Sequence, residues 1–278
     1  MADKVSNIIE KLLLTQGISE YGIIDFEKLC VINPKLLRGE TVKSVLVALL
    51  PYRREEFVCT DGLNAGLFAR IRDYHGCFYQ IAEALLPELE ATVGGTVFYA
   101  ADHSPIAEKD AAQKCGLGFI GRNSLLINPR YGSFVFIGCF FFTERLDERL
   151  GERRGGCGDC HRCIDACPTD AISQGVDIER CLSYISQKSR KEDGDRELLR
   201  LTKTVWGCDI CQNACPYNKN AMWGGLDCFA EGFLPRISAE IIDGMDDGEY
   251  RSHAFSYRKR KVILENCLTA EGKYDKMQ

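Results

Sequence analysis

No stretch of the 278-residue chain approaches the 18 or so consecutive apolar residues that a membrane-spanning helix needs. The most apolar stretch, residues 134–142, has the length of a strand. The N-terminal residues MADKVSNIIEKLLL contain neither the basic segment nor the small-residue cleavage site of a secretion signal. The sequence therefore predicts a cytoplasmic protein without a membrane partner.

An excess of positive charge is also missing. Asp and Glu number 40 against 35 Lys and Arg, which gives a net charge of -5. This balance excludes a general nucleic-acid coat protein, while a local basic patch is still compatible with one bound RNA. With 45% hydrophobic and 27% charged residues, the chain has enough apolar material for a core and is not expected to be disordered.

Cysteine, by contrast, is abundant, with 15 in the chain. In a reducing compartment, so many cysteines are more often metal ligands or catalytic groups than disulfides. Those that stand alone in apolar or mixed sequence are expected to be ordinary small hydrophobic residues. They are Cys30, Cys59, Cys77, Cys115, Cys139, Cys228 and Cys267. The others all fall within residues 157–215 and carry the chemistry.

The first cysteine run reads Cys157-x2-Cys160-x2-Cys163-x3-Cys167, followed by Pro168. This is the spacing of bacterial ferredoxins, in which such a run holds [4Fe–4S] clusters. The first three thiolates occupy corners of one cubane, and the fourth ligates the other cluster. Zinc also accepts thiolates, but its sites use pairs of C-x2-C knuckles and do not need this run. We therefore expect iron–sulfur clusters.

The second run, Cys208-x2-Cys211-x3-Cys215, is one cysteine short of the first. A full copy would have cysteine where Val205 stands, and Cys181 restores the total to eight. The spacing therefore predicts two clusters that exchange ligands between the runs. Cluster one takes Cys157, Cys160, Cys163 and Cys215, and cluster two takes Cys167, Cys181, Cys208 and Cys211. By itself, this module indicates electron transfer.

Strand and helix patterns alternate in the first 150 residues. Helices are expected at 4–16, 68–89 and 105–114, and strands at 22–26, 44–50, 96–101, 124–128 and 133–142. The last two strands flank a turn-forming segment and are expected to form a hairpin. The pattern predicts an α+β or α/β fold, with a mixed sheet flanked by helices.

Three domains are expected on this basis. They are an α/β catalytic domain over residues 1–150, a double-cluster ferredoxin-like domain over 151–225 and a short C-terminal helical segment over 226–278. Because the cluster domain occupies only about a quarter of the chain, another part must receive or supply the electrons.

Asp102 is the carboxylate best placed for chemistry. It follows the strand expected at 96–101, in a loop with His103 and Ser104. Ligands of open sheets bind where strands end, so Asp102 is a candidate catalytic acid. The alternative is that Asp102 caps a helix that begins near Pro105.

A glycine-rich segment, Gly116-Leu-Gly-Phe-Ile-Gly121, has the spacing GxGxxG. A dinucleotide-binding fingerprint follows a strand and opens a helix. Here the expected order is helix and then strand, so a nicotinamide site is not expected. The glycines would instead permit a tight bend and a close approach of a ligand to the backbone.

Taken together, these segments resemble the epoxyqueuosine reductase family. The resemblance rests on residues 102–108 (DHSPIAE), 116–124 (GLGFIGRNS), Gly132-Ser133, the first cysteine run and residues 206–216 (WGCDICQNACP). It extends, with gaps, from about Ser44 to about Ala270. An ordinary ferredoxin has neither of the first two segments.

The resemblance implies a cobalamin-dependent reductase with two [4Fe–4S] clusters and a core shared with reductive dehalogenases. Such enzymes reduce the epoxide of epoxyqueuosine in tRNA to the cyclopentene of queuosine. The resemblance also implies that Asp102 protonates the epoxide oxygen and contacts cobalamin, which is bound without its lower base. The other implied cobalamin contacts are Gly121, Arg122, Asn123, Ser124, Leu126 and Ser133.

The implied partners are a tRNA carrying epoxyqueuosine, or a smaller related substrate, and an external electron donor such as ferredoxin or flavodoxin. A monomer is expected. The family continues into a C-terminal helical-repeat domain that helps to bind tRNA, and residues 250–270 resemble only its first part. Two alternatives stay open: a corrinoid reductase of another substrate, such as an organohalide, and a non-enzymatic electron carrier that binds no corrinoid.

Overall fold

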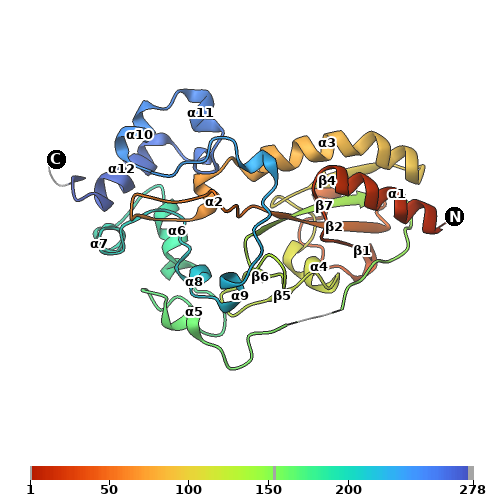
Figure 1. Ribbon diagram of the computed structural model, residues 1–278, viewed down its shortest axis with the longest axis horizontal. Coiled ribbons are helices and arrows are strands. Elements are labelled where there is room, and N and C mark those ends of the chain that lie inside the picture. The colour runs from red at the N-terminus through yellow and green to blue at the C-terminus, as the bar shows by residue number, and fades with distance from the viewer. Residues whose placement is uncertain (1, 153–154, 275–278) are drawn as a thin grey trace. The chain divides into compact units, whose positions relative to one another are not determined.

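The computed structural model describes residues 2–152 and 155–274, which form two compact units. The first unit comprises Met1–Tyr52, Cys77–Gly121 and Leu125–Gly156, and the second comprises Arg53–Gly76, Arg122–Ser124 and Cys157–Gln278. Neither unit is therefore one continuous stretch of sequence. Figure 1 labels most of the helices and strands of both.

A four-stranded sheet in the order β1-β2-β7-β4 forms the centre of the first unit. Its strands are β1 (Tyr21–Asp25), β2 (Ser44–Pro51), β4 (Val97–Ala100) and β7 (Val135–Phe142). All three pairings are antiparallel, and β2 pairs with β7 from Ser44↔Phe142 to Pro51↔Val135. Every residue of β2 is buried, which explains its continuous apolar sequence.

Helices cover both faces of this sheet. They are α1 (Ala2–Thr15), α3 (Tyr74–Val93) and α4 (Glu108–Lys114). On one face, α4 adds Ala111 and Ala112 to a core that contains Phe141. The next residue back, Phe140, meets Phe78 of α3 edge-on, with 5.6 Å between the ring centroids. Because neighbouring residues of a strand point to opposite faces, α3 and α4 lie on opposite sides.

The predicted fold class, a sheet flanked by helices and followed by a cysteine-rich module, is confirmed. Parallel and antiparallel pairing both occur, but in different sheets. The four-stranded sheet is antiparallel throughout, and the parallel pair is a separate small sheet of β3 (Asn64–Ala65) and β8 (Thr204–Trp206) in the second unit.

One expected pairing is wrong. A third small sheet joins β5 (Phe119–Ile120) to β6 (Leu126–Ile127), so the strand near 124–128 does not form a hairpin with β7. The turn between them does form, because Asn128 and Gly132 exchange both backbone hydrogen bonds at 2.9 Å. Beyond this turn, β7 lies between β2 and β4, which occupy both of its edges.

The helix expected over residues 68–89 is divided. The first part is α2 (Leu67–Arg70), and the chain then becomes extended at Ile71, with φ -108° and ψ 172°. Arg72 forms an isolated bridge with His253 before α3 begins at Tyr74. No helix within residues 2–152 and 155–274 is long and apolar enough to cross a membrane.

The second unit consists mainly of short helices. They are α2, α5 (Arg162–Asp165), α6 (Leu182–Gln187), α7 (Asp193–Leu201), α8 (Ile210–Asn213), α9 (Pro216–Lys219), α10 (Ala239–Gly244), α11 (Asp247–Arg251) and α12 (Arg260–Ala270). Single turns of 3-10 helix occur at Phe26–Lys28 and Pro34–Leu37 in the first unit, and at Ile178–Arg180, Asp227–Phe229 and Ala254–Tyr257 in the second.

Helix α12 completes the core of the second unit. Its residues Ile263 and Cys267 are fully buried together with Val205 and Trp206 of β8. Asn266 is also fully buried, and its Nδ2 donates to the backbone oxygens of Ser186 and Val205, both at 2.7 Å. The C-terminal helix is therefore fastened to α6 and to the strand that leads into the second cysteine run.

Candidate functional site

The two cysteine runs have related local structures in the second unit. Cys163 lies in α5 and Cys211 lies in α8, and these four-residue helices pack against each other. Cys215 then occupies the N-cap of α9, with Pro216 at the first helical position. Cys167 differs, because a turn rather than a helix follows it.

The thiols of the runs gather in two neighbouring groups. Burial, followed by the nearby Cys157 and Cys215 thiols, raises the pKa of the Cys163 thiol. Burial also raises the pKa of Cys211 to about 12, with smaller contributions from the thiols of Cys208, Cys181 and Cys163. Cys163 thus lies near members of both groups.

This donor set fits iron–sulfur clusters. A thiol with a raised pKa is protonated at neutral pH, and metal binding displaces that proton. Among the described residues, no three His, Cys, Asp or Glu side chains converge on one point suited to a single metal ion. A cubane takes one thiolate at each of its irons, so its ligands need not share a point.

Some of the thiols accept hydrogen bonds. The Nδ2 of Asn64 lies 3.4 Å from Cys208 Sγ, and the backbone nitrogen of Ala171 lies 3.4 Å from Cys167 Sγ. The Thr169 hydroxyl is 3.6 Å from the same sulfur. Although burial acts in the opposite direction, the bonds from Thr169 and Ala171 hold the pKa of Cys167 below its ordinary value. No sequence pattern points to Asn64, because it is more than 100 residues from Cys208.

Asp102 lies in the first unit, two residues beyond the end of β4, with an exposed side chain. Its φ of 61° is in the left-handed region, which Asp tolerates better than most residues. Its backbone N–H donates to Glu108 Oε2 at 3.1 Å. The capping alternative is wrong, since α4 begins at Glu108 and its N-cap is Ala107.

The glycine-rich segment has the order α4 and then β5, the reverse of a dinucleotide fingerprint. Its first two glycines allow close packing within the protein. A Cβ on Gly116, whose φ is 75°, would lie 2.2 Å from the Gly151 oxygen, and a Cβ on Gly118 would lie 2.4 Å from the Ile127 oxygen. The expectation that these glycines admit a ligand is therefore wrong for Gly116 and Gly118, because backbone occupies that space.

The segment after the third glycine connects β5 to β6. The backbone nitrogen of Gly121 donates to the Leu125 oxygen at 2.9 Å and closes the loop. Within this loop Asn123 is buried, and Ser124 has a left-handed φ of 60°. Leu126, in β6, is buried as well. Further along, Ser133 is buried and follows Gly132, whose φ is 62°.

Arg122 links this loop to the first cysteine run. Its Nε donates to the Cys160 oxygen at 3.1 Å, and its Nη2 donates to the Gly158 oxygen at 2.9 Å. The guanidinium thus fixes the backbone around an expected ligand of cluster one. No sequence pattern indicates this contact.

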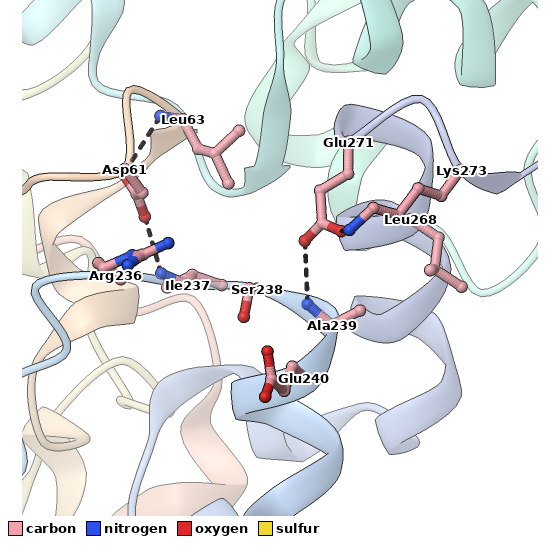
Figure 2. A pocket seen from close by; sticks show the side chains of 10 residues that line it. All are labelled: Asp61, Leu63, Arg236, Ile237, Ser238, Ala239, Glu240, Leu268, Glu271 and Lys273. Carbon is pink, nitrogen blue, oxygen red and sulfur yellow. Dashed lines mark hydrogen bonds and ion pairs between the residues drawn. The ribbon is translucent and has the colours of Figure 1, made fainter.

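A cavity of about 370 Å³ in the second unit contains none of the residues expected from the sequence. Figure 2 shows Asp61 and Glu271 among the side chains that line it. Glu271 accepts bonds from the backbone nitrogen of Ala239 at 3.1 Å and from Lys273 Nζ at 2.7 Å. Both carboxylates already have partners in the protein, Lys273 for Glu271 and Arg70 for Asp61, so we assign the cavity no ligand.

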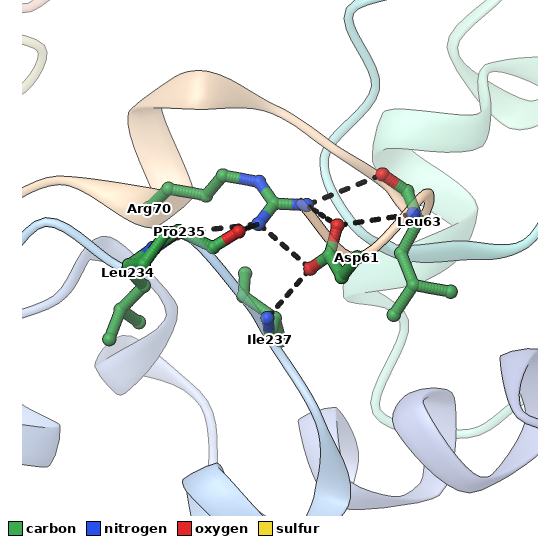
Figure 3. A network of polar contacts seen from close by, with 6 residues as sticks. All are labelled: Asp61, Leu63, Arg70, Leu234, Pro235 and Ile237. Atoms are coloured by element: carbon green, nitrogen blue, oxygen red, sulfur yellow. Dashed lines mark hydrogen bonds and ion pairs between the residues drawn. The ribbon is translucent and has the colours of Figure 1, made fainter. Parts of the chain in front are cut away.

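Asp61 forms a buried ion pair with Arg70, drawn in Figure 3. Both guanidinium nitrogens, Nη1 and Nη2, lie 2.9 Å from the carboxylate oxygens, and Arg70 is 1% exposed. The carboxylate also accepts bonds from the backbone nitrogens of Ile237 and Leu63. Burial alone would raise the pKa of Asp61, but these bonds hold it below its ordinary value. The bonds from Arg70 to the Leu234 oxygen and from Ile237 to Asp61 connect this pair to a distant segment of the second unit.

Comparison with known proteins agrees with both the expected iron–sulfur module and the family resemblance. Residues 156–218 match the family described as a 4Fe-4S double cluster binding domain. An epoxyqueuosine reductase of Leadbetterella byssophila is 34% identical over 235 residues, which cover 83% of this chain and 74% of that protein. An epoxyqueuosine reductase of Gloeobacter violaceus is 33% identical over 248 residues, which cover 83% of this chain and 76% of that protein.

Among solved structures, epoxyqueuosine reductase from Streptococcus thermophilus superposes with a TM-score of 0.80 and is 24% identical. The match covers 98% of this chain and 82% of that chain. At this identity, the likeness shows a shared fold.

Proposed function

The chain belongs to the epoxyqueuosine reductase family, and from this premise we propose that it reduces epoxyqueuosine in tRNA to queuosine. The observation that supports this most strongly is the identity of 34% over 235 residues, which include both the Asp102 loop and the cysteine runs. We propose that the active protein is a cytoplasmic monomer. A solved epoxyqueuosine reductase bound to an epoxyqueuosine-modified tRNA stem loop, with a TM-score of 0.76, supports tRNA as the substrate class.

We propose that three segments of the chain have different roles. Residues 1–150 would supply the catalytic part, although 53–76 and 122–124 belong to the second unit. Residues 151–225 would hold the clusters, and 226–278 would form the C-terminal helical segment of that same unit. Cluster one would be bound by Cys157, Cys160, Cys163 and Cys215, and cluster two by Cys167, Cys181, Cys208 and Cys211. The grouping of Cys163 with Cys157 and Cys215, and of Cys211 with Cys208 and Cys181, supports these ligand sets.

The residues proposed to hold cobalamin are suited to hydrogen bonding. Asn123, Ser124 and Ser133 carry amide or hydroxyl groups that match the carboxamide side chains at the edge of a corrin ring. Gly121, Arg122, Leu126 and Asp102 complete the set. When bound, cobalamin supplies a reduced cobalt centre that delivers electrons to the substrate.

Reduction of an epoxide to an alkene takes two electrons and two protons and releases water. We propose that Asp102 donates a proton to the epoxide oxygen as the C–O bond breaks. Its left-handed backbone, held by Glu108, projects the carboxyl from the end of β4 into solvent, where it can be reprotonated. The electrons would arrive one at a time, through the clusters, from a ferredoxin or flavodoxin.

The experiment that tests this proposal uses the anaerobically reconstituted full chain. We expect it to bind cobalamin, with a cob(II)alamin EPR signal free of nitrogen splitting, and to convert an epoxyqueuosine-bearing tRNA stem loop to queuosine. Two intact clusters without cobalamin binding would identify an electron carrier instead. Turnover of an organohalide, with none of epoxyqueuosine, would identify a different corrinoid reductase.

His103 provides a control for the EPR result, because it is exposed and adjacent to Asp102. If nitrogen splitting is seen and disappears in His103→Ala, cobalt is bound by this imidazole and the proposed binding mode is wrong. If the splitting persists in His103→Ala, its source is the lower base of cobalamin or another histidine, which equally contradicts the proposal.

A further inference from the structure

Asn64 occupies a position from which it can act on cluster two. It lies in β3, which runs parallel to β8, and Cys208 follows β8 by two residues. Its Nδ2 is 2.7 Å from Thr204 Oγ1 and 3.4 Å from Cys208 Sγ. An amide nitrogen carries two hydrogens, so one can serve each acceptor.

The orientation of this amide is determined by a chain of hydroxyl groups. Thr202 Oγ1 donates its one hydrogen to the Leu198 oxygen at 2.7 Å. The 2.7 Å contact between the hydroxyls of Thr202 and Thr204 is therefore donated by Thr204. With its hydrogen committed, the fully buried Thr204 hydroxyl can only accept from Asn64. The NH2 group, and not the carbonyl oxygen, must face Thr204 and Cys208.

Thr169 makes a similar contact in the same proposed cluster. Its hydroxyl lies 3.6 Å from Cys167 Sγ, and either atom can be the donor when the thiol is protonated. Once the sulfur is an iron-bound thiolate it has no hydrogen, so Thr169 becomes the donor. The bonds from Asn64 and Thr169 therefore reach two different sulfurs that are assigned to cluster two.

Hydrogen bonds to the sulfurs are one of the features that set the reduction potential of an iron–sulfur cluster. Reduction adds negative charge that is shared with the thiolates, and an N–H or O–H donor stabilises the more negative state more strongly. We propose that Asn64, held by Thr204, is a positioning residue that raises the reduction potential of cluster two. An electron that enters the two-cluster module then resides on cluster two in preference to cluster one. This inference rests on the proposed function, because it requires Cys208 to be a cluster ligand.

The test is a redox titration, followed by EPR, of the anaerobically reconstituted full chain without cobalamin or tRNA. In Asn64→Leu, which has a similar volume and no donor, we expect one of the two reduction steps to shift to a more negative potential while the other stays. Thr169→Val should shift the same step, because Cys167 and Cys208 are assigned to one cluster. Asn220→Leu, the same substitution at an exposed asparagine, should shift neither.

Several results would overturn the inference. If Asn64→Leu binds both clusters with unchanged potentials, Asn64 does not tune cluster two, and the proposed function stands. If Asn64→Leu and Thr169→Val shift different steps, the shared cluster is wrong. If Asn64→Leu fails to bind iron, Thr204→Val decides, since it keeps Asn64 and removes only its anchor: a smaller negative shift supports the inference and unchanged potentials contradict it. A wild-type protein without clusters would refute the proposed function itself.

Discussion

The backbone N–H of Asp102 donates a 3.1 Å hydrogen bond to the carboxylate of Glu108, the first residue of α4. The bond holds Asp102 at a φ of 61°, where residues other than glycine are uncommon. Backbone strain of this kind is often found at functional sites. In this protein, the strained backbone places the exposed Asp102 carboxyl just beyond the end of β4.

We predict different consequences for substitutions of these two residues. Asp102→Asn keeps a residue that tolerates the left-handed backbone and removes the proton, so turnover of epoxyqueuosine should fall by about 10²–10⁴-fold. Glu108→Ala should lower turnover by about tenfold, or ~1.4 kcal/mol, by releasing the loop. Single-turnover kinetics with cobalamin-loaded protein measures both. Glu108→Gln keeps an acceptor and serves as the control, and full turnover by Asp102→Asn would contradict the assigned acid.

Removal of Cys181 tests the ligand sets. In Cys181→Ser we expect the protein to lose about four of about eight irons and to keep the spectrum of cluster one, because this thiol is the proposed fourth ligand of cluster two. Iron analysis and EPR of the reduced protein measure the two quantities. Cys30→Ser changes an exposed cysteine outside the runs and should leave both unchanged. Retention of both intact clusters by Cys181→Ser would refute the assignment.

The buried pair of Asp61 and Arg70 should dominate the local stability of the second unit. Arg70→Ala leaves a buried carboxylate without its partner, which costs about 3–5 kcal/mol. The exposed pair of Arg200 with Glu197 offers a matched control, for which Arg200→Ala should cost less than about 1 kcal/mol. Denaturant unfolding followed by tryptophan fluorescence compares them, since Trp206 and Trp223 both belong to the second unit. Equal losses in the two variants would show that burial does not strengthen the first pair.

His253 should make stability depend on pH. Burial lowers its pKa below the ordinary 6.5, although the bond to the Ile71 oxygen and the carboxylates of Glu249 and Asp73 oppose the change. The unfolded chain therefore binds a proton more readily than the folded one. This contribution to stability is fully present above pH 6.5 and is lost as the pH falls through the folded-state pKa.

The measurement is the unfolding midpoint between about pH 7.5 and pH 5.5. Because a carbonyl oxygen accepts from Nδ1, that nitrogen carries the hydrogen of the neutral ring. His253→Asn retains a donor without a titrating ring, so its midpoint should fall less over this range than that of the wild type. An identical fall in both proteins would assign the pH dependence to other groups.

The elements that were predicted correctly are those whose residue pattern is determined locally, either by burial of the element or by the geometry of a bound group. Strand β2 is an apolar run buried throughout, β7 is an apolar run buried over its second half, and the cysteine runs have a spacing set by the geometry of a cluster. Pairing was harder, because β7 takes β2 and β4 as neighbours rather than the nearby β6. The turn at Asn128 and Gly132 gave the correct local conformation and the wrong partner.

Contacts between distant segments account for what the sequence did not reveal. Asn64 reaches Cys208 because β3 pairs with β8, and Arg122 reaches the Cys160 backbone from a loop. Neither residue has neighbours that suggest its role. Asp102 was singled out by its place after an expected strand and Ser124 by family resemblance, and their left-handed backbones appear only in three dimensions.

The hydrogen bonds of Asn266 have a consequence for the order of events during biosynthesis. This residue, near the end of α12, holds the backbone of Val205, three residues before Cys208. A ribosome that has just completed the second cysteine run still has about fifty residues to add before Asn266 exists. We expect the binding site for cluster two to take its final form only after α12 has been synthesised, so both cysteine runs would be complete well before the site around them is.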